Sequence, residues 1–258
     1  MPPVPPSLLT DSPALLSFAN VGKRYPDGGR EVVVLEGVSF ELRPGASVGV
    51  YGARRSGKST LLRLAAAIES PDTGVVHFAG RDVTRISARE RSRLLRSSVA
   101  FLASAGWITS PGETVLDHVA MSLGSEGLTM REAKRRALVV LDAVGVAALG
   151  AEEITASLAL RDRALVMLAR ALVREPRLLV VDEPAPMPSL GDRERFCSTL
   201  RAVASERGIA LLMASEDMTT LRGLGALMSI SAGELCSSEE RGTVVPLRPR
   251  RAAASGSS

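Results

Sequence analysis

Hydrophobic and polar positions along the chain follow two periods, one typical of strands and one typical of helices. Residues 31–42 alternate at every second position, whereas residues 59–67 place their leucines at helical spacing. The pattern predicts strands at 16–25, 31–42, 46–51, 74–78, 99–102, 178–181, 209–214, 226–230 and 234–236. It predicts helices at 59–67, 88–96, 114–122, 130–144, 158–173 and 192–206.

The order of these elements indicates an α/β fold. Strands and helices alternate along much of the chain, which favours a mostly parallel sheet with helices on both faces. A run of helices at about 105–173 interrupts the alternation and predicts an inserted helical subdomain. We expect one folded unit at 16–240, between a Pro-rich disordered segment at 1–15 and a basic disordered tail at 241–258.

Composition and charge fit a globular protein. Of the 258 residues, 45% are hydrophobic, enough to build a sizeable core. The formal net charge of +4 comes from the four arginines of the tail, so the rest of the chain is neutral. A neutral folded part argues against a dedicated nucleic-acid binder, and we expect no nucleic-acid partner.

Three further classes are excluded by the sequence. The longest apolar runs, such as 209–215, are far shorter than the ~20 residues that span a bilayer. The first six residues carry four prolines and no basic region precedes them, which does not fit a signal peptide. Two cysteines, Cys197 and Cys236, are too few for a disulfide framework, so we expect a protein of the reducing cytoplasm.

A phosphate-binding motif lies between a predicted strand and a predicted helix. The segment GARRSGKST, from Gly52 to Thr60, fits G-x-x-x-x-G-K-[ST]. Its glycines let backbone N–H groups converge on phosphates, while Lys58 reaches the β- and γ-phosphates and the Ser59 hydroxyl binds Mg²⁺. The two arginines in the middle of the motif, Arg54 and Arg55, could bind phosphate or face water. The residues predicted to bind nucleotide here are Gly52, Arg55, Ser56, Gly57, Lys58, Ser59 and Thr60.

Two acids after a later strand complete this predicted site. Four apolar residues, LLVV, precede Asp182 and Glu183, so both acids stand at the carboxyl end of a buried strand. Open α/β sheets bind ligands at that edge. We expect Asp182 to bind Mg²⁺ together with Ser59, and Glu183 to polarise an attacking water as the catalytic residue.

With both motifs in place, about residues 16–236 resemble the ATP-binding subunits of ATP-binding cassette (ABC) transporters. The resemblance is greatest to the group that serves lipoprotein release, cell division and macrolide export. It implies a P-loop NTPase fold of the ABC type, with a mostly parallel sheet, antiparallel strands near the N-terminus and the helical insertion. Tyr25 matches the aromatic residue that stacks on adenine; the alternative is a half-buried strand tyrosine.

The resemblance also implies how such a subunit works. Two ATP-binding subunits, in a homodimer or a heterodimer, would close on Mg-ATP beside membrane-spanning permease subunits, at the cytoplasmic face of the membrane. Hydrolysis of ATP would then reset the dimer.

Four positions depart from the family pattern. Ser104 stands where the family has a glutamine, and Glu216 where it has a histidine that contacts the γ-phosphate. Ala159–Arg161 replace the serine and two glycines of the signature, and Ser189 replaces an aspartate. These departures leave two functions open: a slow ATPase motor, and an ATP-binding regulatory or structural module with little or no turnover. His77 and His118 are expected to be structural.

Overall fold

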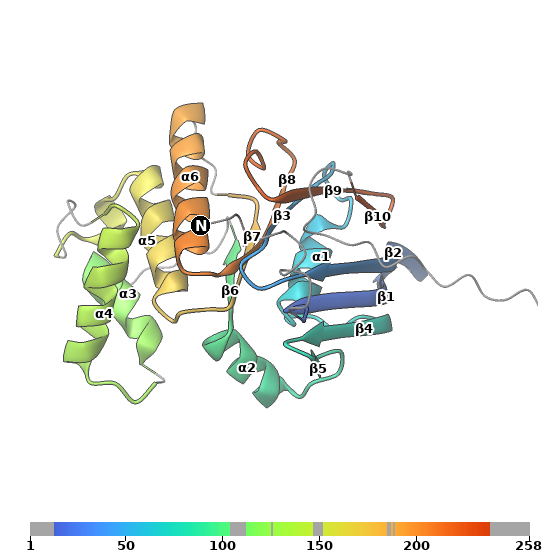
Figure 1. Cartoon of the computed structure of the whole chain (residues 1–258), viewed down its shortest axis with the longest axis horizontal. Helices are drawn as coiled ribbons and strands as arrows, with labels where there is room; N and C mark the ends of the chain where they lie inside the picture. Colours follow the sequence, from blue (N-terminus) through green and yellow to red (C-terminus); the bar gives the residue numbers. More distant parts are fainter. Residues whose placement is uncertain are drawn as a thin grey trace, which may run out of the picture.

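Two sheets and a layer of helices make up the part of the chain that the computed structural model describes, residues 13–103, 112–124, 126–146, 152–184, 187 and 189–237. Figure 1 shows the helical layer on one side, a sheet in the middle and a second sheet on the other side. The described helices are α1 (Lys58–Ala65), α2 (Ala88–Ser97), α3 (Val115–Ala120), α4 (Met130–Ala143), α5 (Leu160–Leu172) and α6 (Leu190–Glu206), with 3-10 turns at Met121–Leu123 and Thr155–Ser157.

The larger sheet has six strands in the order β10-β9-β3-β8-β7-β6. The five strands from β9 to β6 pair in parallel, and β10 joins β9 antiparallel, as the sequence predicts for the final hairpin. Its strands are β3 (Ser47–Tyr51), β6 (Val99–Ala103), β7 (Leu178–Asp182), β8 (Ala210–Ser215), β9 (Ala226–Ser231) and β10 (Glu234–Ser237).

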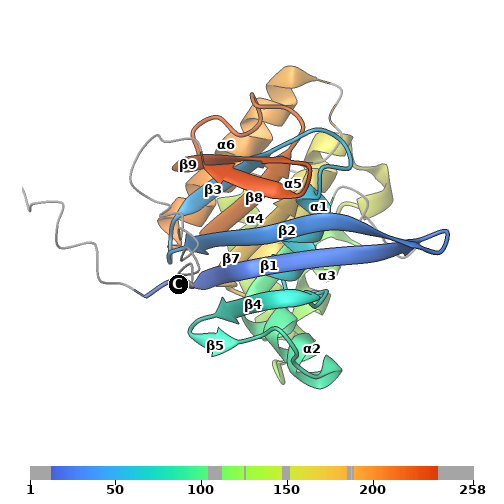
Figure 2. The same cartoon turned by 90° about the vertical axis from the view of Figure 1, so that its right-hand side faces the viewer.

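The smaller sheet is antiparallel, in the order β2-β1-β4-β5 (Figure 2). It is tied to the larger sheet by the backbone N–H of Glu36, which donates to the carbonyl of Gly233 at 3.0 Å. Its strands are β1 (Leu16–Asp27), β2 (Arg30–Leu42), β4 (Thr73–Phe78) and β5 (Arg81–Asp82).

The larger sheet is buried on both faces, which explains the continuous apolar runs of its central strands. In β7, Leu178 and Val180 face the core shared with α1 and the antiparallel sheet, whereas Leu179 and Val181 face the helical core. The alternation of β8 is the same. The edge of the sheet at which these strands end is thereby fixed between two packed layers.

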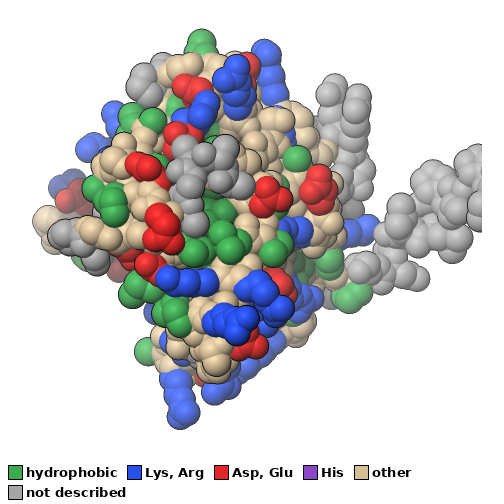
Figure 3. Space-filling view, turned by 90° about the vertical axis from the view of Figure 1, so that its left-hand side faces the viewer, with side chains coloured by type: hydrophobic (Ala, Val, Ile, Leu, Met, Phe, Trp, Pro, Cys, Tyr) green, Lys and Arg blue, Asp and Glu red, His purple; other side chains and the backbone are tan. Residues whose placement is uncertain are grey.

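The helices are held by local contacts as well as by packing. Thr129 and Glu132 form a capping box at the start of α4, and Ser87 and Glu90 form a second one at the start of α2. On the outer face of the helical layer, hydrophobic side chains lie among charged ones (Figure 3). Among the described helices, none is long and apolar enough to cross a membrane.

Several predicted boundaries move in the structure. Ordered structure begins before residue 16, because Leu15 is buried and its N–H donates to Leu42. The helix predicted at 158–173 begins at Leu160, since Ala159 is extended and forms its N-cap. Strand β5 was not predicted because two residues show no periodicity. Residues 1–12, 104–111 and 238–258 lie outside the described residues, and with them Ser104 and the basic tail.

Candidate nucleotide-binding site

A cavity of about 780 Å³ lies where the parallel strands β3, β7 and β8 end. Residues from five segments line it, including Lys58, Glu183 and Glu216, which follow these strands, and Tyr25 and Val34 of the antiparallel sheet. The carboxyl edge of a parallel sheet is where such folds bind ligands. The structure therefore brings the predicted motifs to one cavity.

Two glycines shape the loop between β3 and α1. Gly57 is the N-cap of α1 with a φ of 104°, and a Cβ there would lie 2.8 Å from the carbonyl oxygen of Val34. A Cβ on Gly52 would lie 2.6 Å from Oγ of Ser56 and 2.7 Å from the carbonyl oxygen of Ile230. Both positions thus require glycine for steric reasons, and the loop leads directly into the helix N-terminus at Lys58.

Lys58 is almost fully buried, and its ammonium group lies at the centre of the loop. Its Nζ donates to the carbonyl oxygens of Gly52 at 2.8 Å and Ala53 at 2.9 Å. The side chain is 6% exposed. A buried cation facing backbone carbonyls is a ready partner for an anion entering the cavity.

Ser59 and Asp182 lie together, as expected for a shared ion. The Ser59 hydroxyl donates to Oδ1 of Asp182 at 3.1 Å. One hydroxyl and one carboxylate suit Mg²⁺, which prefers oxygen ligands and takes its remaining ones from phosphate and water. Within the described residues there is no cluster of three or more His, Cys, Asp or Glu side chains suited to a metal. The residues present fit an ion that arrives with a nucleotide.

Glu183 is held in an unusual backbone conformation. Its φ is 53°, in the left-handed region that costs a non-glycine residue about 1–2 kcal/mol. Its carboxylate accepts hydrogen bonds from the Ser215 hydroxyl at 3.0 Å and from the backbone N–H of Glu216 at 2.7 Å. Each oxygen keeps a second lone pair. Glu183 is thereby fixed at the cavity and can still accept a proton.

Glu216 lies on the same side of the cavity as the cations of the loop. Its Oε1 is 3.9 Å from Nζ of Lys58 and 3.5 Å from Nε of Arg54. The sequence analysis expected an anion at this place, and the structure puts the carboxylate there. Arg54 itself is 88% exposed and also lines the cavity.

Tyr25 lines the cavity, and its hydroxyl takes part in a hydrogen-bonded group with Glu69 and Arg63. The hydroxyl donates to a carboxylate oxygen of Glu69, which also pairs with Nε of Arg63 at 2.6 Å. Burial disfavours the charge of Arg63, but the hydrogen bond with Tyr25 and the charge of Glu69 outweigh it and raise the pKa of Arg63. Tyr25 is half-buried, as the alternative interpretation held, and also borders the cavity.

The remaining predicted positions are placed as follows. Arg55 is exposed with a φ of 60°, and Thr60 is buried in the first turn of α1. Oγ of Ser56 is buried and has no hydrogen-bond partner among the described residues. Ser189 caps α6 by accepting from the N–H of Asp192 at 3.3 Å, and Ala159–Arg161 form the start of α5.

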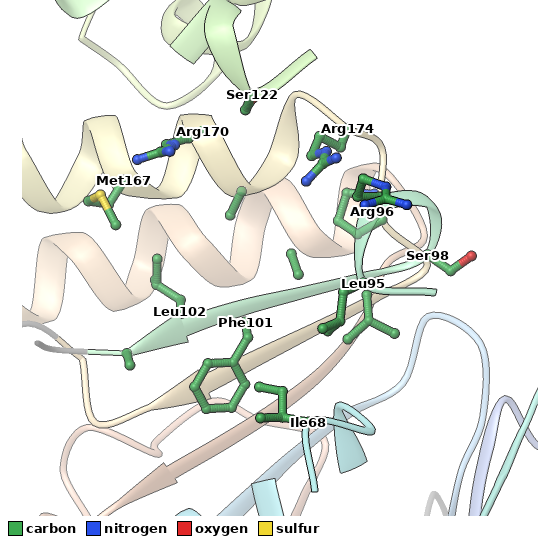
Figure 4. Close-up of a pocket in the computed structure, with 15 residues that line it drawn as sticks. Ile68, Leu95, Arg96, Ser98, Phe101, Leu102, Ser122, Met167, Arg170 and Arg174 are labelled. Carbon is green, nitrogen blue, oxygen red and sulfur yellow. The ribbon is translucent and has the colours of Figure 1, made fainter. Parts of the chain in front are cut away.

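Sequence reasoning missed two groups of residues. Ser215 and Glu69 were not singled out, because their contacts are with residues far away in sequence. The second group consists of three arginines, Arg96, Arg170 and Arg174. They line a cavity of about 480 Å³ beside β6, α2 and α5 (Figure 4). Burial lowers the pKa of Arg174, and the charges of Arg96 and Arg170 lower it further while Glu126 opposes them.

Comparison with known proteins agrees with this architecture. The family model described as "ABC transporter" matches residues 35–186. The chain is 31% identical, over 86% of its length and 97% of the relative's, to a lipoprotein-releasing system ATP-binding protein LolD of Pseudomonas syringae. It is also 31% identical to LolD 2 of Caulobacter vibrioides, over 87% of this chain and 97% of the relative.

Solved structures show the same fold. The dimeric structure of MJ0796, a bacterial ABC transporter cassette, superposes with a TM-score of 0.77 at 22% identity, over 90% of this chain and 99% of that one. CbiO1 from Clostridium perfringens gives 0.76 at 23% identity, over 86% of each chain. The expected P-loop fold of the ABC type is thus confirmed. The chain belongs to the ABC transporter family, as one of its ATP-binding subunits.

Proposed function

We propose that this subunit binds Mg-ATP in the cavity around Lys58 and uses it to drive a transporter. The observation that carries the proposal is the meeting of Lys58, Ser59, Asp182 and Glu183 at one end of the parallel sheet. Lys58 would neutralise the β- and γ-phosphates, while Ser59 and Asp182 would hold Mg²⁺. The bound Mg²⁺ would supply further charge neutralisation at the phosphates.

Glu183 is the group we assign to the attacking water. Its carboxylate is oriented by Ser215 and by the N–H of Glu216, which leaves lone pairs for a water proton. The left-handed φ of Glu183 supports this assignment, because strained residues persist where the surrounding structure holds them and cluster at active sites. Tyr25 would stack on the base, and Gly52, Arg55, Ser56, Gly57 and Thr60 would surround the phosphates.

We further propose that the subunit works in pairs beside membrane-spanning permease subunits, at the cytoplasmic face of the membrane. The similar MJ0796 cassette was solved as a dimer, and the LolD relatives belong to a lipoprotein-releasing system. The pair would be a homodimer or a heterodimer. In either case the partner's signature segment would complete the site built on Lys58.

A second function, nucleotide binding with little turnover, is favoured by one specific contact. Glu216 brings a carboxylate within 3.9 Å of Lys58, where a γ-phosphate would also seek the ammonium. The negative charge of Glu216 disfavours binding of the triphosphate and therefore slows its hydrolysis. A regulatory or structural cassette would then act through binding alone.

Two measurements on the purified chain test these functions. In a calorimetric titration with Mg-ATP, Lys58→Ala should weaken binding at least about tenfold, because a charge-assisted phosphate contact is lost. Arg207→Ala, at an exposed position after α6, is the control and should bind like the wild type. Equal affinity of the wild type and Lys58→Ala would contradict the site.

Steady-state phosphate release then separates the motor from the binding module. A rate above background that Glu183→Gln abolishes supports the motor with Glu183 at the water. Tight Mg-ATP binding with no release above the Glu183→Gln background supports the binding module.

A further inference from the structure

Glu216 supplies the phosphate-binding loop with a negative charge from the chain itself. Its Oε1 lies 3.9 Å from Nζ of Lys58 and 3.5 Å from Nε of Arg54. Lys58 is the cation with which such loops reach the β- and γ-phosphates. The carboxylate and an incoming γ-phosphate therefore compete for the same ammonium.

The backbone that carries this carboxylate is held on both sides. The N–H of Glu216 donates to Oε1 of Glu183 at 2.7 Å, and the preceding Ser215 is buried at the end of β8. The following Asp217 accepts from Arg193 at 3.1 Å. The Glu216 side chain is 45% exposed and can turn, but turning away gives up its pairs with Lys58 and Arg54.

Nucleotides that differ in one phosphate meet this carboxylate differently. A diphosphate can use Lys58 for its β-phosphate and ends there. A triphosphate adds a further group with its own negative charge, which must displace the Glu216 carboxylate or stand beside it. The carboxylate of Glu183, which accepts from the backbone N–H of Glu216, also lines the cavity and adds a second negative charge there.

We propose that Glu216 makes this cavity a site that selects nucleoside diphosphates over triphosphates. The inference rests on the proposed function, that the cavity binds an adenine nucleotide. A site of this kind retains ADP after each cycle, and loading with ATP then depends on whatever neutralises or displaces Glu216. Glu216 is thus a specificity-determining residue for the terminal phosphate.

The test compares two nucleotides on the full chain. Calorimetric titration with Mg-ADP and with the Mg complex of the β,γ-imido analogue of ATP gives two affinities that turnover cannot distort. We expect the wild type to bind Mg-ADP at least about tenfold more tightly. In Glu216→Gln the affinity for the analogue should rise about tenfold, while that for ADP changes by less than about twofold.

Glu206→Gln is the matched control, because Glu206 is an exposed glutamate before β8, at the opposite end of the strand from Glu216. It makes the same change of charge and should keep the wild-type ratio of affinities. Glutamine at 216 keeps the backbone N–H that donates to Glu183, so folding should survive. Glu216→Ala is the second variant and should shift the ratio in the same direction.

The outcomes separate the inference from the function beneath it. If both nucleotides bind and the ratio is the same in the wild type, Glu216→Gln and Glu216→Ala, selection by Glu216 is overturned and nucleotide binding stands. If neither nucleotide binds the wild type, the proposed function fails and the inference falls with it. A ratio that shifts in Glu206→Gln as well would overturn the assignment to Glu216.

Discussion

Tyr25 borders the nucleotide cavity and also makes a hydrogen bond within its own chain. Its hydroxyl donates to Glu69, which is paired with Arg63. A hydrogen bond of this kind contributes about 1 kcal/mol to stability, and a ring stacked on a base contributes about 1–3 kcal/mol to binding. Mutation can therefore separate the two roles.

Tyr25→Ala should cost roughly 1–2 kcal/mol of ATP affinity, because the stacking face is lost. Tyr25→Phe and Tyr25→Trp should cost little, since each keeps a ring face. Titration calorimetry measures all three, with a thermal melt to record the lost bond to Glu69. If the phenylalanine variant binds as weakly as the alanine variant, the hydroxyl, through Glu69, matters more than the ring.

His118 is a buried side chain between a carboxylate and a guanidinium. Its Nδ1 lies 2.9 Å from Glu113, and Arg170 donates to its Nε2 at 3.2 Å. Burial lowers the pKa of His118 and the charge of Arg170 adds to the effect, which together outweigh the opposing influence of Glu113. The ring is thus held neutral, in the structural role that the sequence analysis expected.

This depressed pKa predicts a loss of stability in mild acid. The unfolded chain takes up a proton at the ordinary histidine pKa of about 6.5, whereas the folded chain resists it. The stability that comes from the neutral ring is present above that pH and falls as the pH drops below it. Urea unfolding from pH 7.5 to 5.5 should show a smaller loss in His118→Gln than in the wild type.

The control for this pH series is His77→Gln, which leaves His118 in place. That variant should lose stability across the range as the wild type does. Equal slopes in the wild type and in His118→Gln would mean that carboxylates elsewhere in the chain carry the whole pH dependence.

Helix α5 begins without a side-chain cap, at the place where the family resemblance puts the signature segment. Ala159 is its N-cap and offers no side-chain hydrogen bond, in contrast to Ser87 and Thr129, which cap α2 and α4. A serine at this place can accept from an unpaired backbone N–H of the first turn. The altered signature thus removes a cap as well as two glycines.

Ala159→Ser should therefore stabilise the protein by about 0.5–1 kcal/mol. Ser87→Ala, which removes the cap of α2, should destabilise it by a similar or larger amount. Chemical denaturation measures both changes. A serine at 159 that leaves stability unchanged would show that backbone or water already satisfies this helix start.

The elements themselves were largely predictable, because burial imposes a period on their residues. The runs at 178–181 and 209–214 are apolar throughout, and the structure buries both faces of β7 and β8. The ends were less predictable, since Ala159 and Leu15 are placed by contacts rather than by pattern. The capping box of α4 was predictable because it depends on two residues three apart.

From residue types and spacing alone, the site was predictable only where its chemistry is local in sequence; the family resemblance added Tyr25 and Glu216. The motif from Gly52 to Thr60 and the two acids after β7 can be identified in the sequence by residue type and spacing. The contacts of Glu216 with Lys58, and of Tyr25 with Glu69, join segments that meet only after the sheet has formed. Such pairs leave no periodic trace in the sequence.

For the assembled transporter, the start of α5 matters because the resemblance places it against the partner subunit's nucleotide. In this chain the guanidinium of Arg161 is already engaged, at 3.0 Å from Oδ1 of Asp162 and 3.9 Å from Oδ1 of Asp192. Two carboxylates of its own chain compete with any phosphate across the dimer. This favours obstruction by Arg161 over a role as an arginine finger acting on the partner's ATP.

Arg161→Gly should consequently raise the rate of phosphate release or leave it unchanged, because a long side chain is removed from the surface that the family resemblance places against the partner. Combination with Glu216→His should raise the rate further, since the substitution removes a negative charge that repels the γ-phosphate. Steady-state phosphate release at saturating Mg-ATP measures both, with Glu183→Gln as the blank. Arg161→Ala controls for glycine's effect on the helix. A rate that falls severalfold in both Arg161 variants would show that the guanidinium stabilises the transition state from across the dimer.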